Sequence, residues 1–187
     1  VSGEGFALLR AVEASIVRPL SVGAVRFVYS TNATTTRRGM FATLGLGAPD
    51  ILLRNVSSMG SMIGVVNAGS VPSPFFVLRV SSYNDTFAGM LAWERTMPRD
   101  LVTLFPTQSG FLAVATSTAT TTAPITTRTP AFYDEVIANH DVRVYRGALG
   151  DSVLLYGYWN QRTLVIARDA DAFTEILGRL ANARSGP

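Results

Sequence analysis

Hydrophobic and polar positions along this chain predict helices and strands in a mixed order. Residues 4–18 carry Leu9, Val12 and Ile16 at helical spacing, which predicts one amphipathic helix. Residues 24–30 are rich in β-branched and aromatic side chains and precede a polar Thr/Asn cluster, which favours a strand. The N-terminal part is therefore expected to supply one helix and one strand.

Two later stretches each predict a helix, three strands and a closing helix. In the first, the expected elements are a helix over 37–45 ended by Gly45, strands over 50–56, 61–67 and 74–81, and a helix capped by Asn84 or Asp85 that ends near Pro98. In the second, they are a helix over 131–139, strands over 141–147, 151–159 and 162–168, and a final helix capped by Asp169 or Asp171. Short turns between successive strands require antiparallel pairing.

Residues at matching places in the two stretches recur at constant spacing, which indicates that residues 41–94 are duplicated as residues 132–180. One offset relates Phe41 to Phe132, Asp50 to Asp141, Ile51 to Val142 and Leu53 to Val144; a second relates Leu78 to Leu164, Val80 to Ile166, Asp85 to Asp171, Phe87 to Phe173 and Leu91 to Leu177. We expect an α+β fold of two pseudo-symmetric α-β-β-β-α units with antiparallel sheets covered by helices, plus the N-terminal helix and strand. The sequence leaves open whether the units share one sheet or form separate lobes.

The region between the two units has a different composition. Residues 115–130 are almost entirely Thr, Ser, Ala and Pro, which offer little apolar surface to offset the entropy of ordering. The expected organisation is therefore residues 1–106 with the first unit, 107–130 as a mobile linker or long loop, and 131–187 as the second unit.

The composition excludes several kinds of chemistry. The chain has no Cys, and all 16 of its basic residues are Arg, so thiolate metal sites, Schiff-base lysines and phosphate-binding lysine loops are ruled out. The net charge of +3 is spread along the chain instead of forming a stripe. A single histidine, His140, cannot form a His-rich metal site and is interpreted as a turn residue. We expect no catalytic activity, no cofactor and no metal.

The candidate acid and base groups are carboxylates near predicted helix starts. Asp134 and Glu135 are expected in the first turn of a helix, where the helix dipole stabilises negative charge. Helix capping is therefore a sufficient explanation for both residues. A hydrolase that uses Asp134, Glu135 or Asp141 is the least favoured functional hypothesis, and it stays open because the separation of two carboxylates cannot be read from sequence.

The candidate binding residues belong to an aromatic hairpin and its neighbouring arginines. Tyr156, Tyr158 and Trp159 are followed by Arg162, and Arg143 and Arg146 lie on the preceding strand. Cross-strand pairs that stabilise the sheet are the simpler interpretation of the rings. If that face is uncovered, the rings and arginines could instead stack on single-stranded nucleic acid or glycan.

Four segments carry a resemblance to a known family: Gly47-Ala-Pro-Asp-Ile-Leu-Leu-Arg54, Thr86-Phe-Ala-Gly-Met-Leu-Ala-Trp-Glu94, Leu154-Leu-Tyr-Gly-Tyr158 and Glu175-Ile-Leu-Gly-Arg-Leu180. Over nearly its whole length the chain resembles an uncharacterised family of predicted single-pass membrane proteins of reduced-genome candidate-phylum bacteria. The resemblance implies that a cytoplasmic segment and one membrane span precede a domain like this one. It also implies no known activity or catalytic residues.

The leading functional hypothesis follows from the repeat, the missing catalytic residue types and the resemblance. We expect a non-enzymatic, extracytoplasmic domain of a membrane-anchored envelope protein, which binds another envelope protein or assembles with itself. The chain begins with Val1, which is consistent with an N-terminal span that is absent from the sequence. Binding of single-stranded nucleic acid or glycan is the alternative.

Overall fold

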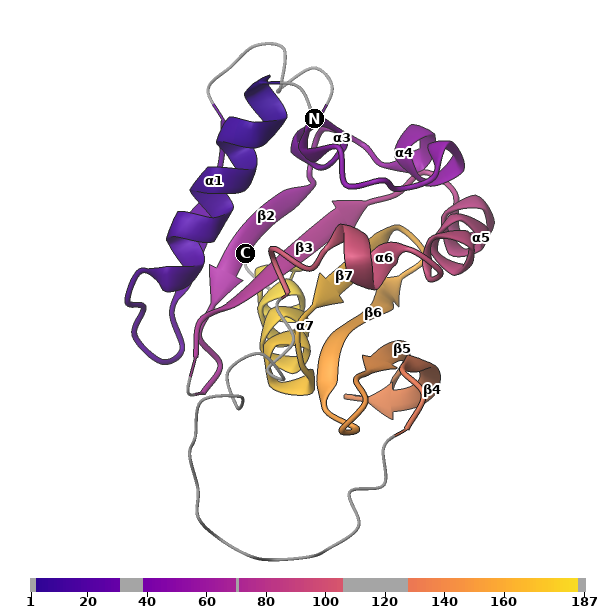
Figure 1. The fold of residues 1–187 in the computed structure, drawn as a ribbon. Helices are drawn as coiled ribbons and strands as arrows, with labels where there is room; N and C mark the ends of the chain where they lie inside the picture. The colour runs from indigo at the N-terminus through magenta and orange to yellow at the C-terminus, as the bar shows by residue number, and fades with distance from the viewer. Residues whose placement is uncertain (1–2, 31–38, 70, 106–127, 185–187) are drawn as a thin grey trace, which may run out of the picture.

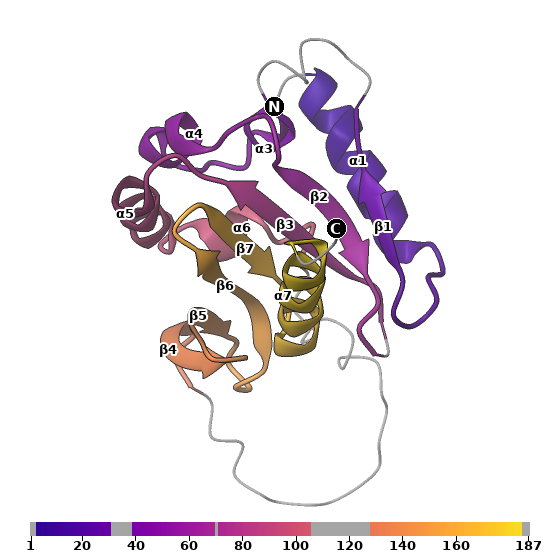
Figure 2. The ribbon, with the colours of Figure 1, turned by 180° about the vertical axis from the view of Figure 1, so that it is seen from behind.

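A computed structural model describes residues 3–30, 39–69, 71–105 and 128–184 of the chain, and most of the expected linker lies outside these ranges. The fold is α+β, as predicted, with one open antiparallel sheet and helices on both of its faces (Figures 1 and 2). The N-terminal helix α1 (Gly3–Val17) and strand β1 (Val25–Val28) confirm the two elements expected there. Leu8 and Val12 of α1 are buried against the sheet because they share one side of the helix.

Strands from both halves of the chain belong to the same seven-stranded sheet. Across the sheet the order is β1, β2 (Met62–Val66), β3 (Ser73–Arg79), β7 (Thr163–Ala167), β6 (Ser152–Asn160), β5 (His140–Arg146) and β4 (Ala131–Ile137). The two halves meet where β3 pairs with β7, with Leu78 opposite Leu164. The ranges 1–106 and 131–187 therefore share one sheet, which answers the question that the sequence left open.

The helices divide between the two faces of the sheet. On one face lie α1, α3 (Met40–Leu44), α4 (Asp50–Asn55), α5 (Tyr83–Trp93) and α6 (Met97–Asp100), and on the other lies α7 (Ala170–Arg184) (Figures 1 and 2). Successive strand residues alternate between two cores: Phe76 and Leu78 face the first group of helices, whereas Phe75 and Val77 face α7. Phe41 of α3 fills the first core, with its ring edge-on to Phe76 and Trp93.

Residues 50–56, predicted as a strand, form helix α4 instead. Pro49 precedes the first turn, Asp50 opens it and Arg54 lies in the last turn, which suits the charge at each end of a helix. The helix is held against α5 at Gly89, where a Cβ atom would stand 3.0 Å from Leu52 Cβ. The strand prediction was wrong because six residues with mixed hydrophobicity fit either period, and the contact with α5 decides between them.

Residues 131–139, predicted as a helix, contain strand β4 and its turn. β4 pairs with β5 along its whole length, from Ala131 opposite Arg146 to Ile137 opposite His140. Ala138 and Asn139 have φ values of 51° and 62° and form the two-residue turn between the strands, a conformation that matches strand twist. The helix prediction relied on the correspondence with residues 37–45, and that correspondence is wrong.

The duplication does not extend to two α-β-β-β-α units. The halves share only a hairpin followed by a helix, β2-β3-α5 and β6-β7-α7, and these helices cover opposite faces. A twofold rotation that exchanged the antiparallel neighbours β3 and β7 would place α5 and α7 on the same face of the sheet. Because they lie on opposite faces, no such rotation relates the two halves.

Helix α5 is capped by Ser82, whose side chain accepts a hydrogen bond from the Asp85 amide, and not by Asn84 or Asp85 as predicted. Asp169 caps α7, as predicted, by accepting from the Ala172 amide at 2.8 Å.

Candidate functional site

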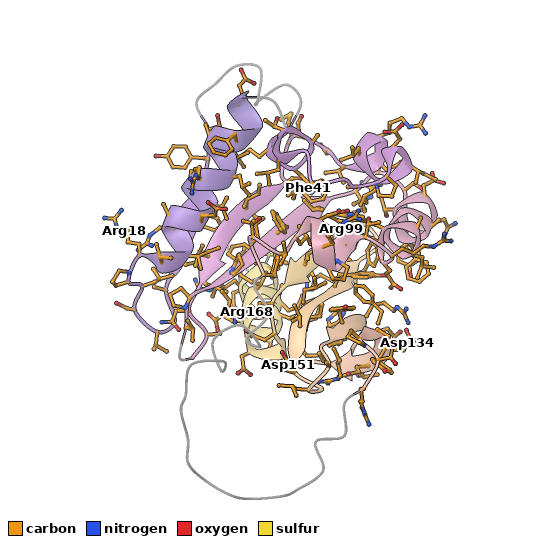
Figure 3. All side chains as sticks on the ribbon, in the orientation of Figure 1. Arg18, Phe41, Arg99, Asp134, Asp151 and Arg168 are labelled. Carbon is orange, nitrogen blue, oxygen red and sulfur yellow. The ribbon has the colours of Figure 1, made fainter. Side chains whose placement is uncertain are left out.

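A concave surface lies between the start of α5 and the β4–β5 hairpin, and we call it the edge groove. It has a volume of about 640 Å³, and α5, β4, β5 and β6 all contribute to its walls. Its lining includes the rings of Tyr83, Phe87 and Tyr158, the carboxylates of Asp134 and Asp141, and the imidazole of His140. Figure 3 shows Asp134 on the β4–β5 hairpin, on the far side of the molecule from α1.

A row of polar groups crosses three strands at the base of this groove. Asp134 lies opposite Arg143 in the β4–β5 ladder, and Arg143 lies opposite Tyr156 in the β5–β6 ladder. Glu94, which follows α5, receives hydrogen bonds from Arg143 Nε and Nη2 at 2.8 and 2.7 Å and from the Tyr156 hydroxyl at 2.7 Å. Arg143 Nη1 also lies 3.0 Å from Asp134 Oδ1. The network ties the edge strands to the helical layer.

These contacts and burial keep the side chains of Arg143 and Tyr156 protonated. The hydrogen bonds from Arg143 to Glu94 raise the pKa of the Arg143 guanidinium above its ordinary value, so it stays charged. Burial, followed by the hydrogen bond to Glu94, raises the pKa of Tyr156, and burial raises the pKa of Tyr158 to about 12. Neither phenol can supply a phenolate at neutral pH.

Three aromatic rings form the apolar wall of the edge groove. Tyr83 and Phe87 are four residues apart on α5 and stack with centroids 5.8 Å apart, while Tyr83 meets Tyr158 edge-on at 4.7 Å. The Tyr158 hydroxyl donates to Thr86 Oγ1 at 2.9 Å. The face of β6 that carries Tyr158 is therefore partly covered by α5, and the ring is held in one orientation.

The structure does not bring the six predicted binding residues together on one surface. Tyr156 is buried and bonded to Glu94, so it cannot stack on a ligand. Arg146 binds Glu135 through two hydrogen bonds of 2.7 and 2.8 Å, and Arg143 is likewise bound to Glu94. Tyr158 lines the edge groove. Trp159 and Arg162 line a different groove at the β6–β7 turn, because neighbouring strand residues point to opposite faces.

The predicted acid and base candidates lie around the β4–β5 hairpin and have different partners. Asp134 and Glu135 are consecutive residues of β4, so they face opposite sides of the sheet, and each contacts a different arginine. Asp141 lies on the same face as Asp134 but is exposed. His140 begins β5 directly after the tight turn, and its Nδ1 lies 3.1 Å from the Tyr158 carbonyl oxygen. All four groups line the edge groove, but Asp134 and Glu135 are each engaged by an arginine.

Sequence reasoning missed Glu94, Tyr83 and Phe87. Glu94 follows the buried α5 residues Met90 and Trp93, and an acid that continues an apolar helix face signals a buried partner. Tyr83 and Phe87 are at i and i+4 of a helix, which could have indicated a shared surface. Nothing in the sequence indicated that this surface would face β4 and β5.

No group of three or more His, Asp or Glu residues in the described ranges is placed to hold a metal ion. Among the helices that the structure describes, none is long and apolar enough to cross a bilayer. Comparisons of the chain with protein-family models, with curated proteins and with solved structures find no match.

Proposed function

We propose that this chain is a non-enzymatic interaction domain that binds a positively charged segment of another envelope protein in the edge groove. The observation that carries the proposal is the combination of three aromatic rings with the carboxylates of Asp134 and Asp141 around one hollow of about 640 Å³. Aromatic faces and carboxylates both attract cations. The arginine in this wall, Arg143, is already neutralised by Glu94 and Asp134.

The position of the groove at the end of the sheet supports an extended partner. Among the described strands, β4 lies at one edge of the sheet and pairs only with β5. Val136, near the C-terminal end of β4, is 70% exposed and lines the groove. An unpaired edge strand can accept a further strand from a partner through main-chain hydrogen bonds. A partner strand along β4 would place alternate side chains on the face of the sheet that carries Asp134 and the edge groove.

The placement of the carboxylates supports binding more than catalysis. A glycosidase-type pair needs two carboxyl groups on either side of one bond, and Asp134 and Glu135 lie on opposite faces. Asp134 and Asp141 line the same groove, but both are exposed to solvent and Asp134 is bound to Arg143. The membrane-anchored, extracytoplasmic location remains part of the proposal and depends on the family resemblance.

The test is a pair of capped nonapeptides, one of alternating valine and arginine and one of alternating valine and glutamate. We expect the arginine peptide to bind and the glutamate peptide not to bind, as measured by isothermal titration calorimetry. Tyr83→Ala should weaken binding about fivefold, in the range of one cation–π contact. Val136→Arg should abolish it by adding a like charge and blocking β4.

Val22→Arg is the matched control, because Val22 is also 70% exposed but does not line the groove. It precedes β1 at the opposite edge of the sheet. Equal binding of both peptides, no binding at millimolar concentration, or equal loss in the Val22→Arg and Val136→Arg variants would each contradict the proposal. Sedimentation velocity on the same variants would show whether the occupant is a second copy of this chain.

A further inference from the structure

A second groove, which we call the arginine groove, lies at the β6–β7 turn and has a volume of about 670 Å³. Arg79 reaches it from the end of β3, and Trp159, Asn160 and Arg162 reach it from the turn. The last turns of α7 close one side with Leu180 and Ala183. No acidic residue belongs to this lining.

Arg79 and Arg162 are held close to each other by the sheet and differ from Arg143 and Arg146 in their surroundings. Arg79 is opposite Thr163 in the β3–β7 ladder, and the Val80 amide donates to the Arg162 carbonyl oxygen at 2.9 Å. Both side chains are exposed. Within the described ranges neither guanidinium has a carboxylate within ion-pair distance, whereas Arg143 and Arg146 are each bound by one or more. Two uncompensated cations next to each other are suited to an anion.

A large aromatic ring and a polar turn complete the arginine groove. Trp159 is partly buried against the α7-side core and also lines the groove. The turn is fixed by Asn160, whose side-chain oxygen accepts from the Arg162 amide at 2.8 Å. Gln161 at the turn is exposed and adds a side-chain amide to the lining. An anchored indole next to two guanidinium groups is the arrangement that stacks a base and holds its phosphate.

We propose that the arginine groove binds single-stranded nucleic acid through one stacked base and two phosphates. Guanidinium groups bind phosphate oxygens through paired hydrogen bonds, and indole rings stack on bases of any sequence. The end of α7 contributes a partial negative charge that opposes an anion, but this effect is small compared with two full positive charges. The site therefore keeps Trp159 and Arg162 of the sequence prediction, adds Arg79, and leaves out the other four residues (Tyr156, Tyr158, Arg143 and Arg146).

The test is a titration of fluorescein-labelled oligothymidylate of twelve nucleotides, followed by fluorescence anisotropy at several salt concentrations. We expect binding at low salt, with a slope of log K against log salt of about −1.4, since each neutralised phosphate of a single strand contributes about −0.7. The double variant Arg79→Gln with Arg162→Gln should weaken binding at least tenfold and bring the slope close to zero. Trp159→Leu should weaken binding about tenfold, while Trp159→Phe, which keeps an aromatic face, should bind nearly as wild type does.

The control is Arg18→Gln with Arg54→Gln, which removes the same net charge outside the groove. Far-UV circular dichroism of each variant shows that it is folded. Absence of wild-type binding at low salt, a salt-independent affinity, or equal weakening by the control pair would overturn the proposal. Competition by thymidine monophosphate at equal concentration of nucleotide units would also overturn it, because the site would then be one for free nucleotides. Tyr83→Ala leaves this binding unchanged, so failure here and failure of the edge groove can be told apart.

Discussion

Arg143 and Arg146 differ from Arg79 and Arg162 in the side chains that surround them. Arg143 and Arg146 are each held by a carboxylate through two hydrogen bonds and fix the edge of the sheet. Arg79 and Arg162 are exposed beside a tryptophan and lack such a neighbour in the described ranges. Because a paired guanidinium has little charge left to offer a ligand, only the second pair is a candidate for anion binding.

The residue whose removal should matter most in the network is Glu94. Its side chain is 14% exposed and that of Arg143 is 21% exposed, so Glu94→Gln leaves a poorly hydrated cation with the exposed Asp134 as its nearest charge. We expect a loss of about 2 kcal/mol or more in the free energy of unfolding, measured by urea denaturation.

The control for Glu94→Gln is Glu175→Gln, which breaks the exposed pair between Glu175 and Arg179 on α7. An exposed helical pair of this kind contributes about 0.3–0.5 kcal/mol. Equal losses in the two variants would show that the Glu94 network does not stabilise the sheet edge.

At the scale of elements, the β4–β5 hairpin shows how a local conformation positions the edge groove. Its turn places Ala138 and Asn139 in the left-handed region, with φ values of 51° and 62°. Asn tolerates this region, whereas Ala is strained there because its Cβ approaches the following carbonyl group. The hairpin therefore contains one residue that suits the turn and one that does not.

Ala138→Asn should stabilise the protein by about 0.5–1 kcal/mol, because Asn visits the left-handed region at lower cost. Thermal denaturation followed by circular dichroism measures the change. Ala148→Asn is the comparison, since Ala148 also lies in a turn between strands but does not have a positive φ. If Ala148→Asn raises the melting temperature as much as Ala138→Asn does, the strain at Ala138 is not the cause.

At the scale of the whole molecule, the β3–β7 pairing joins the two halves of the chain into one cooperative unit. Phe76, Leu78, Leu164 and Ile166 are all fully buried in the same core, although they come from different halves. A sheet that is continuous across this pairing cannot lose one half without exposing the core of the other. The two halves should therefore unfold together.

Two single-tryptophan variants test this expectation. Trp159→Phe leaves Trp93 of α5 as the reporter of the first half, and Trp93→Phe leaves Trp159 as the reporter of the second. In each variant the urea midpoint from tryptophan fluorescence should equal the midpoint from far-UV circular dichroism. Separate midpoints within either variant would mean that the halves unfold independently.

The sequence by itself determined the α+β class, the N-terminal helix and strand, most strands and the final helix, because these depend on hydrophobic periodicity and on local caps and turns. Gly45 ends α3 in the left-handed conformation and Asp169 caps α7, as their residue types indicate. Of the six predicted binding residues, Trp159 and Arg162 line the arginine groove, and Arg143, Tyr156 and Tyr158 line the edge groove.

Only the tertiary structure decided the rest. Residues 50–55 and 131–137 carry patterns that suit either element, and packing against α5 and pairing with β5 chose between them. The opposite placement of α5 and α7, and the pairing of Arg143 with Glu94 49 residues away, depend on contacts between segments distant in sequence. Periodicity describes which side chains of one segment share a face, but it does not specify which other segment that face meets.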